Sequence, residues 1–197
     1  MFSYFRPAAT LLAVFTFLTG VLYPAVVTGI SQVTFPVQAN GSLMVQNGQI
    51  VGSRLIGQGF EDPSYFWGRP SATGPVPYNA AASSGSNLGP SNPALVQAVR
   101  ERVSALRASD PTSVALPVPV DLVTTSGSGL DPHISPSAAL YQVRRVARLR
   151  GVSQDAVQLL VDAHIEPRTL GIFGEPRVNV LLLNLALDQL VQNKAQR

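Results

Sequence analysis

The first part of the chain is apolar and almost free of charge. No charged residue occurs from Pro7 to Ser53, and the most apolar stretch within this region is residues 8–30, AATLLAVFTFLTGVLYPAVVTGI. A helix of this length rises about 35 Å, whereas the hydrocarbon core of a bilayer is about 30 Å thick. The pattern therefore predicts a transmembrane helix over residues 8–30.

A cleaved signal peptide is the alternative interpretation of this segment. Signal peptides have an apolar core of about 7–15 residues followed by small residues in an A-x-A pattern. Neither feature is clear here, so the sequence favours an uncleaved anchor. Arg6 precedes the span and the next charge is Arg54. The positive-inside rule then predicts a cytoplasmic amino terminus, residues 1–7, and an extracytoplasmic domain, residues 31–197.

Turn and cap residues predict the elements that follow the span. Asn47-Gly48 separates two short runs, 42–46 and 49–56, and predicts a β-hairpin because both turn residues accept a positive φ. Asn92-Pro93 supplies an N-cap and a first-turn proline for a helix that runs through Ala108.

Three more helices are expected towards the carboxyl end. Ser135-Pro136 opens one that ends at Gly151, and arginines crowd its last turns, where the helix dipole favours cations. Ser153 caps another that runs to about His164, and Leu183, Leu187 and Leu190 share one face of the last.

Strands are expected at residues 118–124 and, as a short strand, at Val178 and Val180. The predicted fold is a single N-terminal transmembrane helix followed by one extracytoplasmic α/β or α+β domain with a small sheet and three to four helices. The sheet order does not follow from the sequence.

Residues 61–93 form a long segment without helical or strand periodicity. Of these 33 residues, 19 are Gly, Pro, Ser or Asn. Loops longer than about 12–15 residues are uncommon in compact domains and tend to be functional or disordered. Tyr65, Phe66, Trp67 and Tyr78 argue against disorder, and the low charge suits burial against a partner.

Composition narrows the chemistry that the chain can perform. Only 13% of the residues are charged, against about 25% in an ordinary soluble domain. There is no cysteine, and the net charge of +3 is spread along the chain, which gives no nucleic-acid footprint. The only lysine is Lys194, so no Walker A loop exists. No cluster of His and acidic residues predicts a metal site, and His164 is expected at the edge of the core.

Two other functional classes remain open at this point. Ser128, His133 and Asp121 can be arranged as a catalytic triad, because triads are defined by geometry and not by order. The chain is then a membrane-tethered extracytoplasmic hydrolase. Alternatively, it is an anchored module that binds wall or lipid components through the aromatic loop, residues 61–93.

Six strings together resemble one family in their order along the chain. They are GSRLIGQGF (52–60), YFWGRPSAT (65–73), SGSNLGPSNP (84–93), VTTSGSGLDPHISP (123–136), QVRRVARLRG (142–151) and GEPRVNVLLLNLALD (174–188). With the single amino-terminal span, they resemble the C subunit of the bacterial Kdp potassium-transporting P-type ATPase, the KdpC family. The resemblance covers nearly the whole chain.

The resemblance implies an accessory, non-catalytic subunit of an inner-membrane pump that takes up potassium at the expense of ATP. Its partners are the ion-translocating and ATP-hydrolysing subunits, with membrane lipid around the span. The P-type phosphorylation motif DKTGT is absent from this chain. The residues expected to contact a partner lie in the strings 65–73 and 84–93: Tyr65, Phe66, Trp67, Gly68, Arg69, Pro70 and Asn87.

The resemblance also implies a catalytic chaperone that raises the ATP affinity of the hydrolysing subunit. In that view Gln142 helps to hold ATP, although the chain has no cofactor of its own. An extracytoplasmic Gln142 cannot touch ATP that is bound in the cytoplasm. Any such influence then has to pass through coupled conformations.

Overall fold

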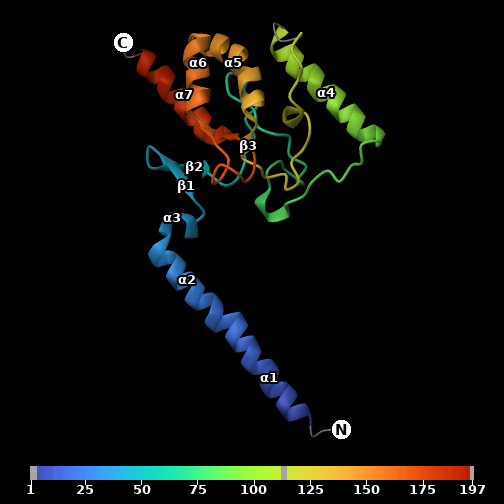
Figure 1. Ribbon diagram of the computed structural model, residues 1–197, viewed down its shortest axis with the longest axis vertical. Coiled ribbons are helices and arrows are strands. Elements are labelled where there is room, and N and C mark those ends of the chain that lie inside the picture. The colour runs from blue at the N-terminus through green and yellow to red at the C-terminus, as the bar shows by residue number, and fades with distance from the viewer. Residues whose placement is uncertain (1–3, 112–114, 196–197) are drawn as a thin grey trace. The chain divides into compact units, whose positions relative to one another are not determined.

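The computed structural model describes residues 4–111 and 115–195, which divide into two compact units, Met1–Val51 and Gly52–Arg197. Figure 1 shows an amino-terminal unit that is mostly helical and also contains a strand, and a second unit of helices and short strands. Residues 1–3, which belong to the expected cytoplasmic segment, lie outside the described part.

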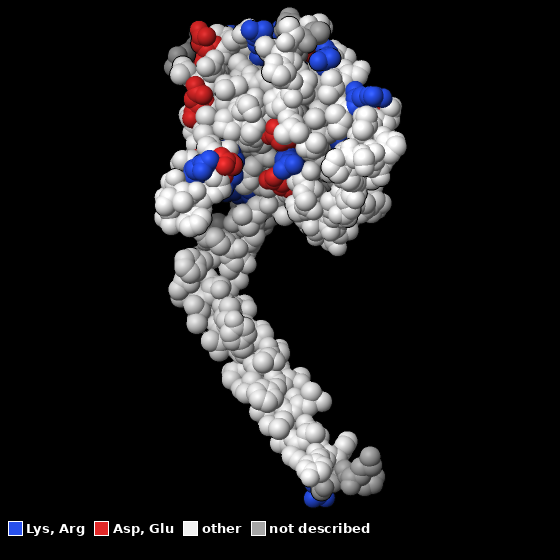
Figure 2. Space-filling view, turned by 45° about the vertical axis from the view of Figure 1, so that its right-hand side comes forward, with Lys and Arg blue, Asp and Glu red and all other residues white. Residues whose placement is uncertain are grey.

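The first unit is dominated by one long apolar helix. It consists of α1 (Phe5–Phe17), a π-helical turn η2 (Leu18–Leu22) and α2 (Tyr23–Thr34). None of its residues is buried, and the 30-residue stretch is long and apolar enough to cross a membrane. The helix contains the expected span and extends it at both ends. Figure 2 draws it white except for one basic group near its end, because Arg6 is the only charged residue before Arg54.

The π-helical turn ends two residues before Pro24. A proline has no N–H to donate to the carbonyl four residues earlier, here that of Gly20. Helices accommodate such a missing bond by local widening, often at a π-bulge. The position of the turn therefore follows from the sequence Gly20–Pro24.

A short helix and a hairpin follow the span. The helix is α3 (Pro36–Ala39), and the hairpin pairs β1 (Leu43–Gln46) with β2 (Gln49–Ser53). Asn47 and Gly48 have φ angles of 52° and 77°, as a two-residue hairpin turn requires. The predicted hairpin is confirmed.

Four helices lie in the second unit, and the first three of them start at the predicted caps. They are α4 (Pro93–Ser109), α5 (Pro136–Arg150), α6 (Gln154–Ala163) and α7 (Val180–Ala195). The side chains of Asn92, Ser135 and Ser153 each accept a backbone N–H in the first turn of the helix that they cap. Gly151 ends α5 with a φ of 64°. These boundaries are set by local chemistry, which explains why the sequence predicts them.

The sheet of the second unit is small and antiparallel. Its order is β3 (His133–Ile134), β5 (Arg177–Asn179) and β4 (Ile165–Glu166), so the last strand in sequence lies in the middle. Val178 lies in β5, as expected, but Val180 is already the first residue of α7.

The strand expected at residues 118–124 is wrong. The segment holds a 3-10 turn, η5 (Val120–Leu122), and its next residue, Val123, is buried beside Leu122, so apolar and polar positions do not alternate. The Asp121 carboxylate accepts the backbone N–H of Ser135 at 2.7 Å, which ties this turn to the start of α5. Pro117 and Pro119 also lack the N–H groups that a strand ladder needs.

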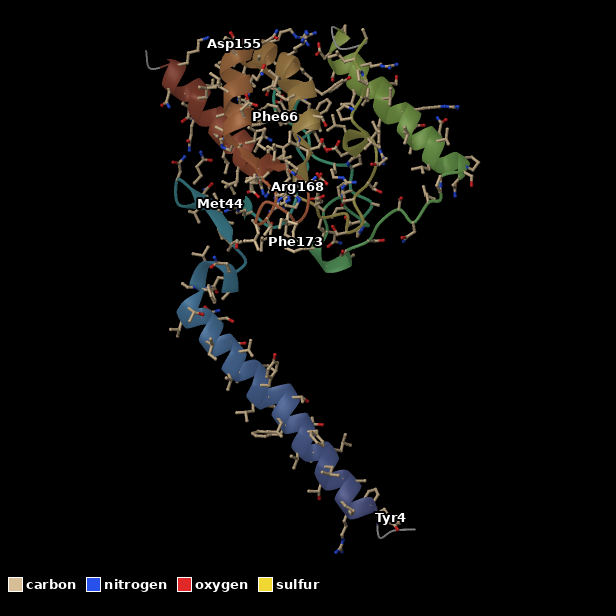
Figure 3. All side chains as sticks on the ribbon, viewed as in Figure 1. Tyr4, Met44, Phe66, Asp155, Arg168 and Phe173 are labelled. Carbon is tan, nitrogen blue, oxygen red and sulfur yellow. The ribbon has the colours of Figure 1, made fainter. Side chains whose placement is uncertain are left out.

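The core lies between α5, α6, α7 and the central strand β5. It is built mainly of Val and Leu, among them Val146, Val157, Val178, Leu183 and Leu187. Phe66 completes it from the long loop and is fully buried. Figure 3 places its label among α5, α6 and α7. Residues 61–93 thus lack long regular elements, apart from a 3-10 turn at Ala80–Ala82, yet part of them belongs to the core.

Candidate functional site

Gln142 of α5 clamps the aromatic loop to the domain. Its Oε1 accepts the backbone N–H of Trp67 at 2.8 Å, and its Nε2 donates to the carbonyl of Trp67 at 3.1 Å and to that of Ala138 at 3.2 Å. Arg145 donates to the same Oε1 at 2.6 Å. The side chain is 1% exposed, and all four of its hydrogen-bonding positions are occupied.

Arg145, one turn further along α5, supports the same stretch of loop. Its guanidinium lies 3.9 Å from the centre of the Trp67 ring and donates to the carbonyls of Pro63 and Tyr65. Burial lowers the pKa of Arg145 to about 10, which still leaves the side chain charged at neutral pH. The charge is compensated by carbonyl oxygens, the Gln142 amide and the π face of Trp67.

A second clamp comes from α7 and holds Phe66, the residue before Trp67. The amide of Asn184, also buried, accepts the backbone N–H of Phe66 at 2.9 Å and donates to its carbonyl at 3.0 Å. These two bonds repeat the pairing that Gln142 makes with Trp67, so consecutive loop residues are held by amides of two different helices.

Tyr65 is fixed at the outer edge of these clamps. Its hydroxyl lies 3.1 Å from the Asp188 carboxylate, and the Arg150 guanidinium stacks 4.1 Å from its ring centre. Arg150 also pairs with Asp188 at 2.9 Å and donates to the Ser64 carbonyl. The arginines expected along the last turns of α5 therefore divide: Arg145 and Arg150 face the loop, whereas Arg144 and Arg148 are exposed.

Arg69 continues the fixed loop towards the segment before α5. It pairs with Asp131 at 3.3 Å and donates to the carbonyl of Thr125 at 3.1 Å. Burial raises the pKa of Asp131, but hydrogen bonds from the His133 ring and backbone and the charges of His133 and Arg69 outweigh it, so the pKa lies below its ordinary value. The carboxylate is therefore held in its ionised form.

The Tyr78 side chain lies close to the loop backbone and explains why position 68 holds a glycine. The Tyr78 hydroxyl donates to the carbonyl of Arg69 at 2.5 Å, and a Cβ at position 68 would lie 3.0 Å from that hydroxyl. Burial raises the pKa of Tyr78, which keeps its proton available for this bond. Pro70 is half-buried beside Arg69.

The second expected contact string, 84–93, lies mostly at the surface. Its start is attached to the domain by a bond from the Ser84 N–H to the carbonyl of Ser128 at 3.0 Å. Asn87 is exposed and adopts a φ of 52°. Of the seven residues expected to contact a partner, Asn87 is exposed, Phe66 is buried in the core, and the other five are partly buried.

The residues of the hypothetical hydrolase each bond to other groups. Ser128 Oγ accepts the N–H of Leu130, His133 Nδ1 lies 3.4 Å from Asp131, and Asp121 binds Ser135. No bond joins any two of the three. His164 Nδ1 lies 2.7 Å from the carbonyl of Leu160, one turn earlier.

Within residues 4–111 and 115–195, no group of three His, Cys, Asp or Glu side chains could hold a metal ion. An open hollow of about 500 Å³ is lined by Arg69, Asp121, Asp131, His133 and their neighbours. Its acidic groups pair with basic side chains or with Ser135, and Gln142 does not line it. In this arrangement Gln142 has no hydrogen-bonding capacity left for a nucleotide.

Arg145 and Asn184 are not among the site residues expected from the sequence, although both hold the loop together with Gln142. The available indication was a polar residue on the apolar side of a helix: Arg145 follows Gln142 by three positions, and Asn184 stands next to Leu183 in an otherwise apolar run. Arg and Asn are rarely buried on the apolar face of a helix unless a polar partner is buried with them.

Comparison with known proteins gives one consistent result. Residues 5–189 match the family model described as "KdpC: K+-transporting ATPase, c chain". A protein of Herpetosiphon aurantiacus named "Potassium-transporting ATPase KdpC subunit" is 65% identical over 190 residues, 96% of this chain and 98% of its own length. Proteins of the same name from Sorangium cellulosum and Methylococcus capsulatus are 64% and 62% identical and cover 95% and 96% of this chain, and 98% and 100% of their own lengths.

Proposed function

The chain belongs to the KdpC family, the c chain of K+-transporting ATPases, and on this premise we propose that it is an accessory subunit that stabilises the assembled pump and does no chemistry itself. One observation supports this role most directly. The aromatic loop is fixed by buried Gln142, Arg145 and Asn184 and is therefore a rigid surface. Rigid surfaces lose little conformational entropy when they bind.

The apolar helix Phe5–Thr34 serves as an uncleaved anchor in the bacterial inner membrane. Because Arg6 precedes the span, the amino terminus is cytoplasmic and the domain is extracytoplasmic. A periplasmic reporter enzyme fused after Arg197 is expected to be active. A reporter that works only in the cytoplasm and is active at the same position would overturn the orientation.

The partner surface consists of the solvent-facing parts of residues 65–73 and 84–93. Phe66 cannot contribute its side chain, since it is fully buried, so it supports the surface from inside. Trp67, Arg69, Pro70 and exposed Asn87 remain accessible for a contact with the ion-translocating subunit. Asn87 offers the sharpest test, because its side chain has no role in the core.

The test is co-purification of the tagged chain with its pump from potassium-starved cells, together with potassium-stimulated ATPase activity. Asn87→Arg is expected to reduce recovery of the complex, whereas Asn87→Gly, which tolerates the positive φ, retains it. Gln158→Arg, on the exposed face of α6, is the control for an added charge. Equal recovery for Asn87→Arg and both controls would remove this surface from the proposal.

The influence on ATP affinity passes through the clamped loop and not through a contact between Gln142 and ATP. This follows from the occupied hydrogen-bonding positions of Gln142 and from its predicted extracytoplasmic location. Two variants separate the mechanisms in the purified complex: Gln142→Ala removes one clamp, and Asn184→Ala removes the other without touching Gln142. Equal losses of ATP affinity support transmission through the loop, whereas a loss confined to Gln142→Ala indicates direct binding. Unchanged affinity in both removes the chaperone role from these residues.

A further inference from the structure

The connection between β4 and β5 is a hairpin-like loop with an apolar tip. Leu170 is 84% exposed, Ile172 72% and Phe173 63%. Single exposed apolar residues are ordinary, but a contiguous group of large ones marks an interaction surface. Neither the aromatic loop nor the 84–93 string includes these residues.

Backbone hydrogen bonds hold the tip in one shape. Thr169 and Phe173 donate to each other's carbonyls at 2.9 Å, and the Gly171 N–H donates to the carbonyl of Arg168 at 3.0 Å. Arg168 and Glu175 close the base of the loop with an ion pair of 2.6 Å. The apolar side chains are thus displayed on a structured turn, which lowers the entropic cost of binding.

Arginines surround the stem of this loop. Arg54 and Arg177 both pair with Glu166, at 2.8 Å and 3.2 Å, and Arg168 pairs with Glu175. Three partly exposed guanidinium groups therefore lie beside two carboxylates at the stem. Figure 3 labels Arg168 and Phe173, which mark the stem and the tip of the loop.

We propose that the loop 168–175 inserts its tip into the interface of a bilayer containing anionic lipid. Leu, Ile and Phe side chains gain by leaving water for the boundary of the acyl chains, while arginines bind phosphate headgroups. The inference rests on the proposed anchoring, because only a domain tethered to a membrane-spanning helix is retained at a bilayer.

The chain has no cysteine, so one introduced cysteine can carry a unique spin label. The full-length chain is placed in nanodiscs of phosphatidylethanolamine and phosphatidylglycerol, and the label at Ile172→Cys is compared with one at Leu159→Cys, an exposed apolar position on α6. Collision rates with oxygen, which concentrates in lipid, and with a water-soluble nickel complex are measured for both. Retention of the chain in the discs tests the anchoring separately.

The label at position 172 is expected to show an oxygen-to-nickel ratio about threefold or more above that at position 159, and to lose most of this difference in discs of phosphatidylcholine alone. Equal ratios at the two positions in chains retained by the discs would overturn the proposal. Protection of position 172 only when the ion-translocating subunit is present would also overturn it and would assign the tip to a protein contact.

Discussion

At the scale of single residues, the most informative feature is a buried amide that bonds to the backbone of a distant loop. Gln142 uses both acceptor and both donor positions, and two of the bonds go to Trp67, 75 positions earlier in the chain. A buried N–H or C=O that loses its partner costs about 1–3 kcal/mol. One side chain thus accounts for a large part of the loop's fixed position.

Gln142→Leu is expected to lower the free energy of unfolding by about 2–4 kcal/mol. The reason is that the backbone N–H and C=O of Trp67 and one N–H of Arg145 lose their partner. Denaturant unfolding of the detergent-solubilised chain measures this through the fluorescence of Trp67, the sole tryptophan. Gln158→Leu, at an exposed position of α6, is the matched control and should stay within about 0.5 kcal/mol of the parent. Similar losses in the two variants would contradict the clamp.

The carboxylate of Asp131 predicts a dependence of stability on acid pH. Burial raises its pKa, whereas the hydrogen bonds from His133 and the charges of His133 and Arg69 lower it. The lowering is the larger effect, so the folded pKa lies below that of the unfolded chain. The ionised group therefore stabilises the fold at pH values above the unfolded pKa, about 3.9, and this contribution is lost as the pH falls through the lower folded pKa.

Asp131→Asn should accordingly be less stable than the parent at pH 5–7 and approach it at lower pH. Thermal unfolding between about pH 2 and pH 6 measures the difference. Asp162→Asn, an exposed position on α6, controls for the loss of one negative charge. A gap between Asp131→Asn and the parent that stays constant down to pH 2 would show that the carboxylate's charge is not involved.

At the scale of elements, three glycines allow the cost of a strained backbone to be distinguished from the cost of a steric clash when each is replaced by alanine. A Cβ at Gly127 would meet no heavy atom within 4 Å; Gly151 is equally open but has a φ of 64°. At Gly129 the φ is 68° and a Cβ would lie 2.6 Å from the Ser84 carbonyl oxygen.

Substitution by Ala should therefore leave stability within about 0.5 kcal/mol at Gly127, cost about 1 kcal/mol at Gly151 and cost about 3 kcal/mol or more at Gly129. Chemical denaturation of the three variants gives the order directly. If Gly151→Ala were as harmful as Gly129→Ala, the open space around the end of α5 would be contradicted.

The elements that the sequence predicts are those whose determinants are local. Asn92, Ser135 and Ser153 cap their helices through bonds two or three residues away, and Asn47-Gly48 forms its turn by itself. The pairing of Phe66 with Asn184 spans 118 positions, so the sequence around Asn184 indicates a buried polar group but not its partner. The strand expected at 118–124 is also wrong in a segment with a distant contact: Asp121, in the 3-10 turn, accepts the N–H of Ser135, 14 positions away.

At the scale of the whole molecule, the chain combines an apolar helix, whose one charged residue is Arg6, with a domain in which buried polar side chains fix a long loop. Ser128, His133 and Asp121 bond to separate groups, and the polar side chains that converge most closely, Gln142 and Arg145, are spent on the backbone of the loop. Membership of the KdpC family could be recognised from the ordered motifs, because they extend over nearly the entire chain. The internal clamps could not, because they depend on tertiary contacts.

The orientation of the whole chain depends on very little charge, and this makes it testable. Arg6 is the only charged side chain before Arg54, so the positive-inside rule acts mainly through one residue and the amino terminus. Arg6→Glu combined with Ser42→Arg and Gln46→Arg should invert a measurable fraction of molecules, because the positive charge then lies on the other side of the span. Paired cytoplasmic and periplasmic reporters fused after Arg197 measure that fraction.

The double variant Ser42→Glu and Gln46→Glu is the matched control, since acidic residues contribute little to orientation and should leave the parent arrangement in place. An unchanged orientation in the arginine variant would show that contacts with the partner subunits, and not the charge of the chain, determine which side the domain occupies.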